Sequence, residues 1–215
     1  MRRTFGCGFE LLGNGGMLLV IAVAMSVPLF VKLLGLNVSM TVCKWAYTVA
    51  FFGQMMTQVL VLELPVKVHW ATGKGMGGVP FSKWIMTKGI LVNLLIYYIC
   101  SLILMLGIHG IGMVAGVVDA SWVDDMLFLF GLFFCLEAGI QVICGLFDRF
   151  NSSGGYYNGI TAAAVIAIPK VMGAIKFSVG KAVLLHVLFM ICGSLLMYLH
   201  LVRRYKKRSS VQQCG

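Results

Sequence analysis

Residues 88–108 read KGILVNLLIYYICSLILMLGI, and this apolar run decides the fold class of the chain. Its length is about 20 residues, which is what an α-helix needs to cross the hydrocarbon core of a bilayer. Five further runs have the same character, and they cover residues 17–36, 43–63, 125–147, 159–175 and 182–202. We therefore expect an all-α, polytopic membrane protein, with about six transmembrane helices in one transmembrane domain over residues 1–215.

The composition excludes an ordinary soluble domain. Of the 215 residues, 60% are hydrophobic and 11% are charged, whereas a typical soluble domain has about 45–50% apolar and roughly 25% charged residues. The 17 Lys and Arg residues outnumber the 7 Asp and Glu residues. These bases lie between or beyond the apolar runs and form no basic face interleaved with aromatic residues. We therefore expect no nucleic-acid partner.

The distribution of charge predicts an orientation in the membrane. Bases gather in the N-terminus, the link 64–87, the link 148–158 and the tail 203–208, whereas the link that follows the third run carries acidic residues. Since cytoplasmic loops are enriched in Lys and Arg, we expect both termini to be cytoplasmic. Three bases depart from this rule because the same orientation places them near the outer face: Lys170, Lys176 and Lys181.

Two of the apolar runs leave alternatives. The run 88–108 either ends at Ile108 or continues to Val118. The run 159–175 contains Pro169 and Lys170. It predicts either a broken helix or a short re-entrant pair.

Residues 79–88 have the features of a helix that enters the membrane from the cytoplasm. Pro80 and Ser82 are favourable at a helix start. Trp84 suits the headgroup level, and Lys83 and Lys88 suit the cytoplasmic boundary. We interpret these residues as a membrane-entry anchor, which serves either as part of a coupling region or only to hold the third span in place.

The pattern Pro80-Phe81-Ser82-Lys83, followed by Lys88, resembles the segment that opens the third span in permease subunits of ABC transporters of the second exporter class. Two further stretches are similar in a looser way, namely 143–150 with 156–160 and the basic ending 198–207. The resemblance implies a permease subunit that moves a substrate out of the cell and has no ATPase of its own.

In that family, the cytoplasmic link before the third span docks on the ATPase. The resemblance therefore implies a coupling role for the link 64–87, with these contact residues: Val66, Lys67, Val68, Trp70 and Lys74. Burial of Trp70 at the membrane surface is the alternative. The implied partners are a separate ATP-binding subunit, a second permease copy or paralogue, and the lipid bilayer. The implied location is the cell membrane, as a multi-pass protein of a bacterial inner membrane.

Polar residues within the spans are candidates for the transport route. Glu137 and Gln141 lie one turn apart in the run 125–147, and Gln54 and Gln58 form a similar pair in the run 43–63. A carboxylate at membrane depth costs at least ~2.5–3.5 kcal/mol on insertion scales, so it indicates a functional site. These residues either line the route or form hydrogen bonds between helices.

No catalytic, cofactor-binding or metal-binding motif is predicted. The segment 73–78 is rich in glycine but lacks the G-K-[ST] ending of a phosphate loop, and H-E-x-x-H is absent. The seven cysteines show no C-x-x-C spacing. We expect no enzymatic activity in this chain. The alternative functions are a substrate-binding membrane subunit of an importer, a stand-alone secondary carrier, or a membrane peptidase.

Overall fold

The computed structural model describes residues 15–72, 85–146, 166–167, 170 and 178–213. Every element in these ranges is a helix, which confirms the all-α prediction. The elements are α2 (Gly15–Leu33), α3 (Met40–Thr72), the π-helical turn η3 (Ile85–Gly89), α4 (Ile90–Val114), α5 (Trp122–Leu146) and α7 (Val179–Gln213).

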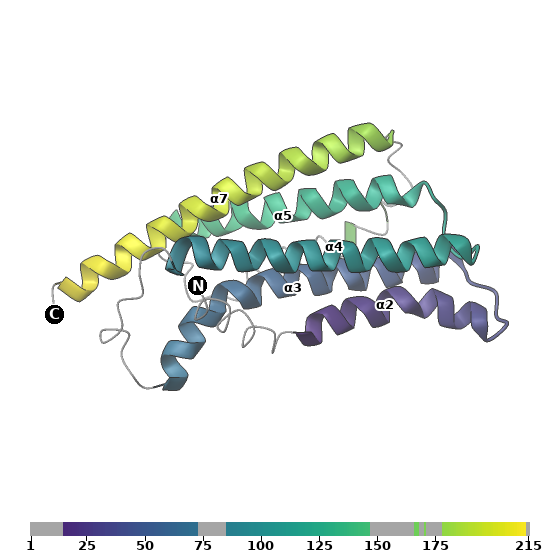
Figure 1. The fold of residues 1–215 in the computed structure, drawn as a ribbon, viewed down its shortest axis with the longest axis horizontal. Coiled ribbons are helices and arrows are strands. Elements are labelled where there is room, and N and C mark those ends of the chain that lie inside the picture. The colour runs from purple at the N-terminus through teal and green to yellow at the C-terminus, as the bar shows by residue number, and fades with distance from the viewer. Residues whose placement is uncertain (1–14, 73–84, 147–165, 168–169, 171–177, 214–215) are drawn as a thin grey trace.

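The helices form an elongated bundle (Figure 1). Helices α2 and α4 run in one direction, and α3, α5 and α7 run in the opposite direction. The links 34–39 and 115–121 therefore lie at one end of the bundle, while the C-terminal ends of α3 and α7 and the start of α4 lie at the other end (Figure 1).

Both links at the first end begin with the same turn. Gly35 has a φ of 73°, and the N–H groups of Gly35 and Leu36 donate to the carbonyls of Lys32 and Val31. Gly116 has a φ of 64° and repeats this pattern at the end of α4. The pattern is the Schellman motif, in which a glycine adopts the left-handed conformation at no steric cost. It turns the chain sharply back into the bundle.

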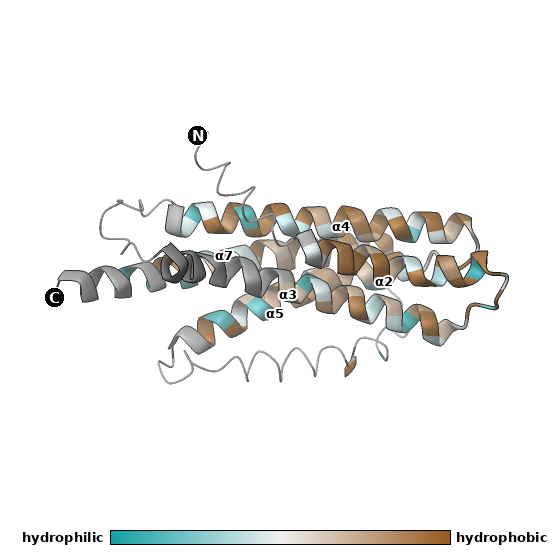
Figure 2. Ribbon diagram, turned by 90° about the horizontal axis from the view of Figure 1, so that it is seen from below, coloured by the Kyte–Doolittle hydropathy of each residue, from teal (hydrophilic) through white to brown (hydrophobic). Residues whose placement is uncertain are grey.

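Three helices in the described residues are long and apolar enough to cross a membrane: Thr87–Val114, Trp122–Ile143 and Val179–Arg203. Leu18–Leu33 forms a shorter apolar helix. Apolar residues dominate along α4 in Figure 2. Large apolar side chains are exposed on the outer faces of the helices, with Ile103 at 64% and Leu184 at 61%. These features suit a membrane-embedded protein, because lipid rather than water is a favourable solvent for such faces.

The helices differ in extent from the predicted spans. The second run was predicted to end at residue 63, but α3 continues as a helix to Thr72. The first part of the predicted link 64–87 is therefore helical. The third run continues beyond Ile108 to Val114, and α7 continues through the basic residues to Gln213. The predicted span 159–175 lies outside the described residues except for 166–167 and 170.

Helices approach each other most closely in two pairs, α2 with α3 and α5 with α7, while α4 packs on the first pair. Glycines permit the close approach of α5 and α7. A Cβ on Gly131 would lie 3.0 Å from the Cα of His186, and a Cβ on Gly193 would lie 3.2 Å from the Cα of Cys135. Small residues of this kind allow membrane helices to pack backbone against backbone. The bundle therefore consists of an α2–α3–α4 group and an α5–α7 pair. The two parts also meet where η3 and the start of α4 pack against α7, around Leu94 and Met197.

Candidate functional site: a polar layer in an aromatic seam

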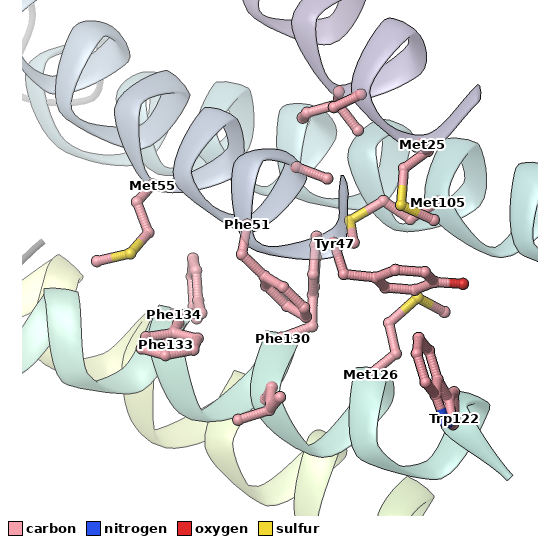
Figure 3. Close-up of a cluster of buried hydrophobic side chains, with 14 of the residues drawn as sticks. Met25, Tyr47, Phe51, Met55, Met105, Trp122, Met126, Phe130, Phe133 and Phe134 are labelled. Carbon is pink, nitrogen blue, oxygen red and sulfur yellow. The ribbon is translucent and has the colours of Figure 1, made fainter. Parts of the chain in front are cut away.

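Aromatic side chains fill the space between the α2–α3–α4 group and the α5–α7 pair. We call this set the aromatic seam, and its members are Tyr47, Phe51, Tyr98, Trp122, Phe130, Phe133 and Phe134. Figure 3 shows these rings, apart from Tyr98, lying between α3 and α5. Because large rings separate the two parts, the backbones of α3 and α5 approach each other less closely than those of α5 and α7.

The rings of the aromatic seam touch across the boundary. Phe51 of α3 contacts Phe130 and Phe133 of α5, with ring centroids 6.0 Å and 5.9 Å apart. Tyr98 of α4 contacts Phe130 and Phe134 at 4.7 Å and 4.8 Å. These distances are typical of favourable edge-to-face or tilted aromatic pairs. Contacts between apolar rings thus close most of the seam.

Three buried polar side chains border the aromatic seam without a hydrogen-bond partner in the described part of the chain. They are Gln54, Ser101 and Glu137, with 2%, 0% and 1% of their surface exposed. Both polar atoms of the Gln54 amide, the Ser101 hydroxyl and both carboxyl oxygens of Glu137 are unpaired there. Burying a polar group without a partner is costly, and burying a carboxylate is especially so.

Helical periodicity places these three residues on the helix faces that form the aromatic seam. Gln54 follows Phe51 by three positions, Ser101 follows Tyr98 by three, and Glu137 follows Phe133 by four. Positions i, i+3 and i+4 share a helix face. Since α3 and α5 run in the same direction (Figure 1) and Phe51 contacts Phe133, Gln54 and Glu137 lie about one turn further along at a similar depth. We call Gln54 and Glu137 the polar layer. Ser101 lies outside this layer, because α4 runs in the opposite direction and Ser101 is therefore one turn from Tyr98 toward the other end of the bundle (Figure 1).

One hydrogen-bonded chain crosses the aromatic seam. The Nδ1 of His186 on α7 lies 2.8 Å from the Leu127 carbonyl oxygen on α5, and its Nε2 lies 3.3 Å from the Tyr98 hydroxyl on α4. A carbonyl oxygen only accepts, so Nδ1–H is the donor. In the neutral imidazole, Nε2 then accepts the hydrogen of the Tyr98 hydroxyl. Tyr98 thereby links the α2–α3–α4 group to both helices of the α5–α7 pair.

A second polar pair lies at the end of the bundle that carries the links 34–39 and 115–121. The Tyr47 hydroxyl bonds to Nδ1 of His109, and the Tyr47 ring packs edge-on against Trp122 at 5.4 Å. A shallow recess adjoins the pair and is otherwise lined by residues of α2, α4 and the link after α4. Its walls are mainly apolar.

The link beyond α4 carries an exposed acidic turn. The backbone N–H of Ser121 donates to Oδ1 of Asp119 over 2.9 Å. This bond, assisted by the Ser121 hydroxyl, lowers the pKa of the Asp119 carboxyl below its usual range. The turn leads into α5, whose first turn contains Asp124 and Asp125.

Four residues were predicted to line a route, and the structure shows that the side chains of two of them are deeply buried. These are Gln54 and Glu137, which belong to the polar layer. Gln141 is half-buried on α5, and Gln58 lies in α3 with its side chain outside the described set. The sequence indicated Gln54 and Glu137 because polar residues interrupt apolar runs there, but it gave no sign of the Tyr98–His186 hydrogen bond. Nothing local links two residues that are 88 positions apart.

The predicted coupling and anchor residues that the structure describes lie at the opposite end of the bundle from the link 115–121. Val66, Lys67, Val68 and Trp70 lie in the last turns of α3. Lys88 lies in η3 and is exposed. The remaining predicted residues lie outside the described ranges: Lys74, Pro80, Ser82, Lys83 and Trp84.

No family model, curated protein or solved structure matches the chain. Within the residues that the structure describes, no group of three or more His, Cys, Asp or Glu side chains is placed to hold a metal ion.

Proposed function

We propose that the chain is the membrane-spanning permease subunit of an ATP-driven ABC exporter, with a transport route that opens along the aromatic seam. The observation that supports this most strongly is the unpaired polar layer between two separately packed parts of the bundle. A stably closed core has no reason to bury unpaired Gln and Glu side chains, because each costs free energy. A route that is alternately closed and hydrated gives these groups water or substrate as partners in the open state.

The packing of the two parts is compatible with such a movement. The α5–α7 pair is joined through glycine contacts and the His186–Leu127 hydrogen bond, which favour motion as one body. Between this pair and the α2–α3–α4 group, the recorded side-chain contacts include ring pairs and the longer Tyr98–His186 hydrogen bond. Separating apolar rings breaks few directional interactions.

We propose six spans with both termini on the cytoplasmic side. In this arrangement α2, α4, α5 and α7 provide four spans, residues 43–63 of α3 provide another, and residues 159–175 provide the sixth. The charge distribution supports the orientation. The bases of 203–208 and the end of α3 lie at one end of the bundle, and the acidic turn at Asp119 lies at the other (Figure 1). Three bases at the end of the bundle that carries Asp119 are exceptions in the described residues, namely Lys32 near the end of α2, Lys44 near the start of α3 and Lys181 at the start of α7.

The extended α3 suggests how ATP hydrolysis would reach the aromatic seam. The 33-residue helix carries Phe51 and Gln54 near its middle and Val66–Trp70 in its last turns. At about 1.5 Å rise per residue it is roughly 50 Å long, which exceeds the ~30 Å hydrocarbon core of a bilayer. A separate ATPase that docks on the last turns would act on the same helix that carries Gln54, with Pro65 between the two parts of the helix as the expected point of bending.

Co-purification tests the proposed function. The tagged full chain is extracted from its native membrane in mild detergent, and the bound proteins are identified by mass spectrometry. We expect a soluble subunit with nucleotide-binding motifs and a second permease chain. The double variant Val68→Asp/Trp70→Asp is expected to insert in the membrane but to lose the ATPase.

A matched control introduces the same chemical change at the other end of the bundle. Leu34 and Leu36 are exposed in the link after α2, so Leu34→Asp/Leu36→Asp is expected to keep the ATPase. Retention of the ATPase by the Val68→Asp/Trp70→Asp variant would refute the coupling role. Absence of any ATPase from the wild-type complex, together with transport that continues without ATP, would favour a stand-alone secondary carrier.

A further inference from the structure

We propose that the polar layer selects organic cations, that is, apolar molecules that carry an ammonium-like or phosphonium-like positive charge. This inference rests on the proposed function, because it names the substrate class of the same route. Three observations carry it: a buried acidic side chain, the aromatic rings about one helical turn from it, and the absence of Lys and Arg from the buried side chains that the structure describes.

The first observation is the unpaired carboxyl group of Glu137. It is 1% exposed, and both oxygens lack a hydrogen-bond partner in the described part of the chain. A carboxyl group in such a place stays protonated unless a cation lies beside it, so a cationic substrate would favour the ionised form and compensate its charge. The Gln54 amide, at a similar depth on α3, adds an unpaired carbonyl oxygen that can also face a positive charge.

The second observation is the cluster of aromatic rings about one helical turn from Glu137. Phe133 and Phe134 precede Glu137 by about one turn of α5, and they contact Phe51 and Tyr98 from the opposite side. The face of an aromatic ring carries partial negative charge and attracts cations within about 6 Å of its centre. A carboxylate beside several such rings is the combination that recognises a cation with an apolar body.

The third observation is the absence of a buried base. Among the side chains that the structure describes, the buried charged and polar set contains no Lys or Arg. Both ring nitrogens of His186 are already engaged, one with the Leu127 carbonyl oxygen and the other with the Tyr98 hydroxyl, so neither is available to a substrate. An anionic substrate would therefore meet a carboxylate and ring faces of like sign without a base to offset them.

The rings pack against each other in this structure, so a substrate enters only when the α5–α7 pair separates from the α2–α3–α4 group. The site would then offer negative charge on the α5 side and an amide oxygen on the α3 side. An apolar cation replaces the ring contacts that opening breaks, and its charge compensates Glu137. Binding would thus be coupled to the opening of the seam.

Two ions of matched size and opposite charge test this inference. Tetraphenylphosphonium and tetraphenylborate are compared for binding to the purified full chain in nanodiscs by equilibrium dialysis, with empty nanodiscs subtracted. We expect saturable binding of tetraphenylphosphonium and no saturable binding of tetraphenylborate. In the Glu137→Gln variant we expect tetraphenylphosphonium binding to weaken about tenfold or more, the loss that follows from removing one charge pair.

Two more variants sharpen the test. Phe133→Leu keeps the side chain apolar but removes an aromatic ring face. It is therefore expected to weaken the binding of tetraphenylphosphonium selectively. Asp119→Asn removes an exposed carboxylate outside the seam and is expected to bind like wild type. Size-exclusion chromatography confirms that each variant is folded and monodisperse.

Any one of three results would overturn the inference. Tetraphenylborate binds saturably with equal or greater affinity, neither ion binds saturably, or the Glu137→Gln variant binds tetraphenylphosphonium as the wild type does. The assay needs neither ATP nor an ATPase, because equilibrium dialysis lasts long enough for the infrequent opening of the seam without ATP to admit the ion. Phosphonium binding without a co-purifying ATPase therefore retains the substrate class and refutes the exporter, whereas an ATPase partner without phosphonium binding refutes only the substrate class.

Discussion

The Cα of His186 on α7 lies 3.0 Å from the position that a Cβ on Gly131 of α5 would occupy. Next to this contact, the His186 ring donates through Nδ1 to the Leu127 carbonyl of the same helix α5. The small residue and the hydrogen bond depend on each other, because the ring reaches the carbonyl only when the two backbones are close. This junction joins α5 and α7 into one unit.

Gly131→Ala is expected to destabilise the protein, because the added methyl group meets backbone atoms that cannot move away as a flexible side chain can. Overpacking of this kind costs about 1–3 kcal/mol. The measurement is thermal or denaturant unfolding of the purified chain in detergent. Gly139→Ala on the same helix is the matched control, since a Cβ there meets no atom within 4 Å. Equal stability of the two variants would show that the α5–α7 contact is looser than described.

Tyr98→Phe is expected to weaken the link across the aromatic seam, because it leaves Nε2 of His186 without the hydroxyl donor. Hydrogen bonds between membrane helices contribute about 0.6 kcal/mol on average and up to about 1.7 kcal/mol. A double-mutant cycle with His186→Phe measures the coupling energy directly. A coupling energy of zero would mean that the 3.3 Å contact contributes nothing to stability.

Glu137→Leu is expected to raise stability and to abolish transport. The substitution removes a buried, unpaired group whose burial costs about 1–3 kcal/mol, so the unfolding midpoint rises while the route loses its charge. Gln141→Leu, one turn further on α5, is the control. Because the Gln141 side chain is only half-buried, its replacement is expected to raise the unfolding midpoint less. A Glu137→Leu variant that is less stable than wild type would indicate that Glu137 has a structural partner.

The acidic turn before α5 predicts a pH dependence. The Ser121 N–H holds the pKa of Asp119 below its usual value. The folded state therefore binds protons less readily than the unfolded state, and the turn stabilises the fold above the unfolded pKa of an aspartate, which is about 3.9. The advantage is lost as the pH falls below that value. We expect Asp119→Ala to unfold at a slightly lower temperature than wild type at neutral pH, and the difference to vanish in acid. A difference that persists in acid would contradict this role of the turn.

The helical nature of the bundle could be predicted from the sequence because lipid imposes a simple rule. A run of about 20 apolar residues such as 88–108 has one stable way to satisfy its backbone in a bilayer, which is to form a helix. The ends of the helices could not be predicted in the same way. Lys67 and Arg203 end the apolar character of their runs, yet α3 and α7 continue past them. A charged helix in water remains a helix, so hydropathy does not mark its end.

The polar layer could be predicted only in part. Glu137 and Gln54 stand out because polar side chains interrupt apolar runs. Their position beside the aromatic seam follows from contacts such as Phe51–Phe133, which join residues far apart in the chain. Aromatic side chains also suit interfacial positions in membrane proteins, so their spacing alone does not reveal which rings meet.

The central claim is that the aromatic seam opens during an ATP-driven cycle, and labelling at position 54 tests it most directly. The variant Gln54→Cys is made in a chain without the seven native cysteines. Its reaction with a charged, water-soluble maleimide is followed in membranes that contain the ATPase partner. Ile21→Cys is the control, because Ile21 is fully buried on α2 within the opposite part of the bundle.

We predict slow labelling of the Gln54→Cys variant without ATP and much faster labelling during ATP hydrolysis, because the opened seam admits water to position 54. The Ile21→Cys variant should stay unreactive in both conditions. Equal labelling of the Gln54→Cys variant with and without ATP would contradict the opening of the seam.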